Sequence, residues 1–154
     1  MSYTQKRESA LANIETTLEG INGSGNYYLT AATVTRTLDD LNRIAESDLP
    51  FLLIVPLDST PEARTSGDYE ADCPVAILGA VAGDEDQEDS GSLCLRREKF
   101  FSDVQIAMLT DPHRGGYARD TVLRELVIDE AEDVPLALFW TVFGVIIDYS
   151  DNAP

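Results

Sequence analysis

The residues best suited to chemistry are five carboxylates gathered in residues 84–89, which read DEDQED. Acids at alternate positions of such a segment could supply the oxygen ligands of a calcium loop. The EF-hand pattern, however, requires Gly at its sixth position and Glu at its twelfth, where this sequence has Asp89 and Leu95. Three interpretations therefore stay open: a loose cation site, a hydrated loop tip, or a surface that repels another polyanion.

Few other residues could carry catalysis. His113, the one histidine, lies in the turn TDPHRGGY with no obvious nucleophile beside it, so we expect an exposed loop residue. Cys73 and Cys94 are expected to be reduced thiols, and no spacing of Cys and His fits a metal site. The glycine-bearing turns lack the Gly-Lys-Ser/Thr ending of a phosphate loop. These features predict a protein that is not an enzyme and needs no cofactor or metal.

The charge balance excludes one class of function and indicates an environment. The chain carries 28 acids and 11 bases, a formal charge of -17, so electrostatic wrapping of nucleic acid is excluded as its main activity. Only Lys6 and Lys99 are lysines. Molar salt shortens the Debye length to about 3 Å and removes most of the self-repulsion that such a charge produces. The composition resembles that of haloarchaeal proteins, although a merely acidic protein is the alternative.

No segment predicts a membrane anchor. The N-terminus MSYTQKRESA has no apolar core and does not resemble a signal peptide. The longest apolar run, residues 134–147, has 14 residues, whereas a membrane-spanning helix needs about 20. We expect a soluble protein without a membrane partner.

Hydrophobic spacing predicts the elements that position these residues. Leu11, Ile14, Leu18 and Ile21 form one stripe of a helix over residues 4–20, with Thr4 as its N-cap. A second helix is expected to begin at Ser92 and to continue to about residue 109. Strands are expected within residues 26–38, 51–55, 74–83, 120–129 and 136–150. Polar loops are expected at residues 57–72, which lack periodicity, and at residues 83–91.

The last strand is the most informative. Apolar side chains occupy both of its faces, including Trp140 and Ile146 on one and Phe139 and Phe143 on the other. This pattern predicts a strand in the middle of the sheet, covered on both sides. The expected fold is α+β, in one domain spanning residues 1–154: a mixed, mainly antiparallel sheet of about five strands, with an N-terminal and a central helix packed on it.

In this order of elements the sequence resembles the tail terminator, or tail completion, family of long-tailed phages and viruses. The resemblance rests on the N-terminal amphipathic helix, NYYLTAATVTRTLDD, LPFLLIVP, PVAILGAVAG, REKFFSDVQIAML, DTVLRELVIDE and a final apolar strand ending VIIDYS. It covers nearly the whole chain. The apolar last strand that finishes in Asp-Tyr is its most characteristic part.

The resemblance implies a virion protein of the tail and neck, assembled in the host cytoplasm. Members form a hexameric ring that caps the tail tube, ends its polymerisation and joins the tail to the head connector. The implied partners are other copies of the chain, the tail tube protein and the connector or stopper protein. Genome DNA would pass through the ring without specific binding, and acids lining the channel would repel its phosphates.

We predict the contact residues from the sequence alone. The ring contacts are expected to be cationic, because the partner copy is acidic, and they are Arg96, Arg97, Arg114 and Arg119. Arg64 and Tyr69 are expected to face the tube from the loop at residues 57–72. For Arg96 and Arg97 the alternative is a solvated face paired with Glu98 and the acidic segment. At the level of function, the alternatives are another neck protein (a head-completion, stopper or adaptor protein), a small cation-dependent enzyme or ligand-binding domain, and a general interaction module.

Overall fold

A sheet of six strands with both long helices on one face makes up the computed structural model, which describes residues 2–38, 40, 44–65, 67–82, 90–129 and 136–150. The strand order is β1 (Thr33–Thr35), β2 (Phe51–Pro56), β4 (Asp68–Ala82), β6 (Leu136–Ser150) and β5 (Asp120–Asp129), while β3 (Thr60–Thr65) pairs with the beginning of β4. Only β1 and β2 pair in parallel. The predicted α+β class and the mixed, mainly antiparallel sheet are confirmed.

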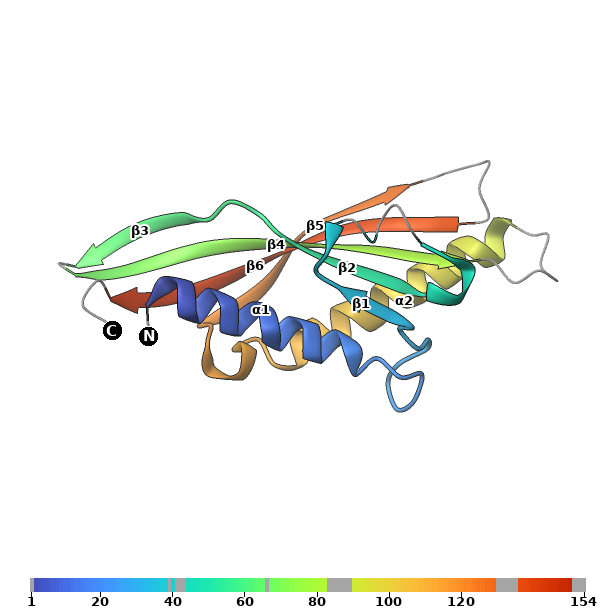
Figure 1. The fold of residues 1–154 in the computed structure, drawn as a ribbon, viewed down its shortest axis with the longest axis horizontal. Helices are drawn as coiled ribbons and strands as arrows, with labels where there is room; N and C mark the ends of the chain where they lie inside the picture. The colour runs from blue at the N-terminus through green and yellow to red at the C-terminus, as the bar shows by residue number, and fades with distance from the viewer. Residues whose placement is uncertain are drawn as a thin grey trace.

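Helices α1 (Tyr3–Glu19) and α2 (Ser90–Thr110) lie along the same side of the sheet (Figure 1). Two short 3₁₀ helices, η2 (Glu46–Asp48) and η3 (Arg114–Gly116), stand in the connections. The first turn of α1, the end of β3, the start of β4 and the end of β6 lie at one end of the molecule (Figure 1). We call the helix-covered face of the sheet its inner face and the opposite face its outer face.

The first helix forms because one stripe of apolar residues can be buried against the sheet. Leu11, Ile14 and Leu18 are buried, as their spacing predicts. The N-cap is Ser2 and not Thr4: the Ser2 hydroxyl accepts a hydrogen bond from the Gln5 amide at 3.3 Å. The Gln5 side chain accepts one from the Ser2 amide at 2.9 Å, which completes a capping box.

Strand β6 lies between β4 and β5, as predicted for a strand in the middle of the sheet. On its inner face Phe139, Phe143 and Ile147 are buried against the helices. The Phe139 ring makes edge contacts with Phe100 and Phe101 of α2, with ring centroids 5.9 and 5.6 Å apart. This side of the sheet carries the main core.

The outer face of β6 is less covered than the sequence predicts. A small cluster of Phe51, Leu53 and Ala80 is buried there, with Leu138 packed against it. Further along the strand Trp140 and Ile146 stay half-buried, because the described residues place no helix over them. The outer face is therefore only partly covered: Val142 is 7% exposed, whereas Leu138, Trp140 and Ile146 are half-buried.

The prediction of a long polar loop at residues 57–72 is wrong. Most of these residues form β3 and the first part of β4, which pair as an antiparallel hairpin. The physical reason is the alternation of DYEADC: Ala71 and Cys73 are buried on the inner face, while Glu70 and Asp72 point outward. A strand can be half polar when its other face is solvated.

The strand expected over residues 26–38 is reduced to Thr33–Thr35. Ahead of it, the backbone amides of Tyr28 and Leu29 donate to the Asp103 carboxylate of α2, at 2.8 and 2.9 Å. A side chain thus satisfies the amides that a neighbouring strand would otherwise bind. Asp103 is fully buried, and burial raises the pKa of its carboxyl group against the opposing effect of these two hydrogen bonds.

Candidate assembly surfaces

Strand β5 is an edge strand that exposes apolar side chains. It pairs with β6 on one side, and no other described strand pairs with it. The described residues include nine exposed large hydrophobic side chains, and four of them lie within six residues of β5: Leu123, Leu126, Val127 and Ile128. Exposed edges of this kind are sites where another chain can add a strand.

A β-bulge divides β5 into two parts. The pairing with β6 shifts between Leu123 and Glu125, which leaves Arg124 as the extra residue. The Arg124 guanidinium crosses β6 over Gly144 and reaches Asp72 of β4 at 2.6 Å. Only glycine leaves room for it, since a Cβ atom at residue 144 would stand 2.0 Å from the Arg124 Nε atom. The bulge therefore directs a cation onto the outer face.

A network of ion pairs covers the outer face at the hairpin end of the molecule. Glu70 accepts both Arg64 and Arg119, the latter at 2.5 Å, and Arg119 lies 3.9 Å from Asp148. With Arg124 and Asp72, three cations are matched to three carboxylates of β4 and β6. Partly exposed pairs of this kind add about 0–1 kcal/mol each, so the network serves mainly to lower the negative charge of this face.

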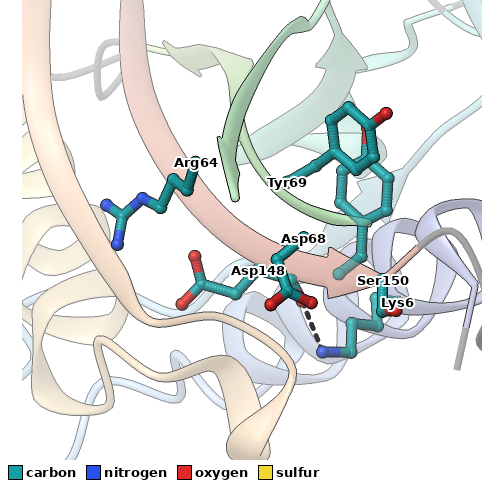
Figure 2. A pocket seen from close by; sticks show the side chains of 7 residues that line it. Lys6, Arg64, Asp68, Tyr69, Asp148 and Ser150 are labelled. Carbon is teal, nitrogen blue, oxygen red and sulfur yellow. Dashed lines mark hydrogen bonds between the residues drawn. The ribbon is translucent and has the colours of Figure 1, made fainter. Parts of the chain in front are cut away.

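An open hollow of about 440 Å³ lies at the same end, lined by Lys6, Arg64, Asp68, Tyr69, Asp148, Tyr149 and Ser150 (Figure 2). Lys6 of α1 donates to the Asp148 carbonyl oxygen. Tyr69 stacks on Tyr149 with ring centroids 5.3 Å apart, and Tyr149 meets Tyr3 at 5.1 Å. Arg64 is bound to Glu70, so the two cations of the hollow already have partners inside the protein.

Of the predicted contact residues, Arg64, Arg119 and Tyr69 come together. Arg64 and Arg119 share the Glu70 carboxylate, and Arg64 and Tyr69 line the same hollow. Arg64 and Arg119 remain about half exposed, which leaves them accessible to a partner. They lie on β3 and just before β5, far apart in sequence, and the sheet brings them together.

Arg114 is not available as a ring contact, contrary to the prediction. Its side chain is fully buried, and its guanidinium donates to the carbonyl oxygens of Met108 and Asp111. Burial lowers the pKa of Arg114, with Asp111 acting in the opposite direction. The side chain closes the carboxyl end of α2, whose last carbonyl groups need donors.

Arg96 and Arg97 lie in the first half of α2. Arg97 is 7% exposed, and its Nη2 atom lies 3.7 Å from Glu98. It is therefore a buried side chain and does not contribute to an exposed basic surface on α2. Arg96 is half-buried. The sequence-based pairing of Arg97 with Glu98 is confirmed, whereas its exposure is not.

The other candidates for chemistry are the single histidine, the two cysteines and the acidic segment. His113 is exposed, as predicted, with its Nδ1 atom 2.9 Å from the Arg119 carbonyl oxygen. Cys73 is buried and Cys94 exposed, and both are free thiols, as expected. Within the described part of the chain, no three His, Cys, Asp or Glu side chains lie close enough together to hold a metal ion. The predicted acidic loop at residues 83–91 lies almost wholly outside the described residues.

No helix in the described ranges has both the length and the apolar character needed to cross a membrane. Comparison with models of protein families gives no match, and comparison with curated proteins gives none either. The likeness to tail terminators therefore stays a prediction that rests on the order of the elements and on the types of residue within them.

Proposed function

We propose that this protein is a structural subunit of a long-tailed virus, which forms a ring on the end of the tail tube, ends tube polymerisation and joins the tail to the head connector. The observation that carries the proposal is the β5 edge, where four exposed apolar side chains lie along a side of the strand with which no described strand pairs. A strand edge of this kind is suited to binding another protein chain.

The arrangement of the sheet is compatible with a closed ring. β5 forms one border of the sheet, and β1 and β3 form the opposite border. A contact between unlike borders of neighbouring copies is head-to-tail, and repetition of such a contact can close into a ring. The long strands β4 and β6 supply a stiff core between the two borders.

The ion-pair network supports a second contact at the hairpin end. Glu70, Asp72 and Asp148 are matched by three arginines there, in a protein whose overall charge is -17. A face with paired charges can approach another acidic chain with less repulsion than the rest of the surface. We assign the tube contact to this end, through Arg64 and Tyr69, and another neck protein of the same build is the alternative assignment.

The test is capping of tubes. Purified protein in about 2 M KCl is added to growing tubes of the cognate tail tube protein, and the tubes are imaged by electron microscopy. We expect uniform rings on one tube end and no further elongation. Tubes that keep growing without terminal rings would contradict the proposal.

A matched pair of variants locates the contact. Val127→Lys places a charge on the β5 edge, where the side chain is 48% exposed, and should abolish capping without loss of the folded circular dichroism spectrum. Leu109→Lys changes a side chain of comparable exposure, 38%, at the end of α2, and should cap normally. Equal capping by both variants would remove β5 from the proposed contact.

A further inference from the structure

The straight part of β5 exposes apolar side chains on both faces of the sheet. Leu126 and Ile128 stand opposite Thr141 and Phe139, on the inner face, and are each 37% exposed. Val127 stands opposite Trp140, on the outer face, and is 48% exposed. A partner packed on one face would leave the other uncovered, whereas a strand added alongside would cover both.

The apolar middle of this edge, residues 126–128, carries no proline, lysine or bulge of its own, while the Arg124 bulge and the acids Glu125 and Asp129 lie on either side of it. Residues 125–128 contain no proline and no lysine, and the β-bulge lies before Glu125, so the backbone from Glu125 onward pairs with β6 in regular register. Alternate residues of an antiparallel edge point their N–H and C=O groups outward. A short regular strand of about four to five residues can therefore be added here.

Comparison of the chain's own strands shows which one fits. β1 has only three residues. β3 contains Pro61, which has no N–H, and its residues 60–64 are exposed and mostly polar. β5 itself has apolar residues at three consecutive positions, so a second β5 covers both faces of the first.

We propose that the β5 edge pairs with the β5 edge of a second copy, antiparallel, around a two-fold axis at Val127. In this register Val127 faces Val127 of the second copy on the outer face. Leu126 faces Ile128 of the second copy on the inner face, and the symmetry repeats that contact. The same register sets the acid Glu125 opposite Asp129 of the second copy, which opposes pairing unless salt screens the two charges. The contact uses the same residues in both copies, so it is complete with two subunits.

Charge makes this pair dependent on salt. Each copy carries -17, and the two copies repel one another at ordinary ionic strength. Molar salt shortens the Debye length to about 3 Å and removes most of that repulsion, while apolar contacts persist. A contact of a few residues buries well under about 1,200 Å², so the pair is weak and concentration-dependent.

The inference goes beyond the proposed ring and does not rest on it. A two-fold pair covers the apolar edge of the free subunit, and it must part before the same edge can join a head-to-tail ring. Disulfide trapping of the pair uses no tail tube protein. A negative trapping result therefore does not contradict the capping proposal, and a negative capping result does not contradict the pair.

Disulfide trapping tests the register. Val127→Cys is prepared in a Cys94→Ser background, because Cys94 is exposed and Cys73 is buried. Directly opposite residues have Cα atoms about 4.5–5.5 Å apart, which suits a disulfide. We expect mild oxidation in about 2 M KCl to give a covalent dimer, and at least tenfold less at 0.1 M.

Leu123→Cys in the same background is the control. Leu123 is also 37% exposed on β5 but lies beyond the bulge, and the two copies of it would be separated by about 25 Å. It should stay monomeric on oxidation. Equal cross-linking of the two variants overturns the proposal, as does a mixture of Val127→Cys and Glu62→Cys that yields only the cross-link between unlike variants, because that product indicates head-to-tail pairing.

A measurement that needs no introduced cysteine, made under reducing conditions because Cys94 is exposed, keeps the test independent of disulfide trapping. Sedimentation equilibrium in about 2 M KCl should show a monomer–dimer equilibrium for the natural sequence and a monomer for Val127→Lys, with unchanged circular dichroism. A natural sequence that is monomeric at all concentrations up to about 1 mM, or a Val127→Lys variant that dimerises equally, overturns the pair.

Discussion

Asp103 shows how one buried carboxylate shapes the segment before β1. Its two oxygens accept the amides of Tyr28 and Leu29, and no described basic side chain forms an ion pair with it. Burial raises the pKa of the carboxyl group. A carboxyl group with a raised folded-state pKa contributes most to stability below its unfolded pKa, near 4, and loses that contribution as the pH rises through the folded pKa.

Asp103→Asn tests this residue. The amide NH₂ group replaces one acceptor, so one backbone N–H loses its partner and stability should fall by about 1–3 kcal/mol. The asparagine does not titrate, whereas Asp103 does. The difference in free energy of unfolding between the natural protein and the variant should therefore become smaller from about pH 4.5 to 7.5. Urea unfolding in molar salt measures it, and a gap that widens with pH would contradict the raised pKa.

Asp111→Asn is the matched control. Asp111 is exposed, and hydrogen bonds from the amides of Gly115 and His113 lower the pKa of its carboxyl group. Its folded-state pKa therefore lies below that of an unfolded aspartate, so its charge does not change above the acid range in either state. The difference in free energy of unfolding between Asp111→Asn and the natural protein should stay constant between about pH 4.5 and 7.5.

Among the elements, the packing of the Phe139 ring over β4 depends on one glycine. The Phe139 ring of β6 lies over Gly79 of β4, and a Cβ atom at residue 79 would stand 2.2 Å from two ring carbons. The ring has little room to move, because Phe100 and Phe101 pack against it. The absence of a side chain at Gly79 thus gives the Phe139 ring the space in which it contacts Phe100 and Phe101 of α2.

Gly79→Ala should therefore lower the free energy of unfolding by about 1–3 kcal/mol, the usual range for overpacking a core. Phe139→Leu alone should also destabilise, by leaving a cavity. The double variant should be more stable than the sum of the two effects, since the smaller side chain makes room for the new methyl group. Denaturant unfolding of the four proteins forms the cycle, and strict additivity would contradict the contact.

The elements also show what could be predicted from sequence. Sequence predicts α1 and β6 correctly. In both, the periodicity of the apolar residues, such as Leu11, Ile14 and Leu18, agrees with their burial in the fold. The hairpin of β3 and β4 was missed although DYEADC alternates, since its charged outer face obscured the inner one. At β5 the consecutive apolar residues 126–128 carried a signal for an exposed edge, but a buried strand has the same pattern.

The contact residues were harder to predict because exposure is a property of the folded chain. Charge alone points to arginines as contacts, but Arg114 is buried at the end of α2, and Arg64 and Arg119 share Glu70. A sequence gives the charge of a side chain but not the carbonyl groups or carboxylates that folding brings to it. The sequence alone predicts only ion pairs between residues close together in the chain, such as Arg97 with Glu98.

At the scale of the whole molecule, the dominant quantity is the formal charge of -17 on 154 residues. The structure relieves part of it through the outer-face ion pairs, but 11 bases cannot neutralise 28 acids. Self-repulsion of this size opposes the compact state and is screened over about 10 Å at 0.1 M salt but over about 3 Å at 1 M. Folding stability should therefore depend strongly on salt.

We expect the thermal midpoint to rise between 0.1 and 2 M KCl, as measured by circular dichroism. The control replaces the five acids of residues 84–89 with their amides, which changes the formal charge from -17 to -12 and should reduce the rise.

Calcium distinguishes this general effect from a local cation site. If the segment is a solvated surface, millimolar CaCl₂ gives no saturable, stoichiometric heat by calorimetry. A flat midpoint across the salt range would show that the acidic composition does not adapt this protein to salt, and a one-to-one calcium isotherm lost in the amide variant would assign the segment to cation binding.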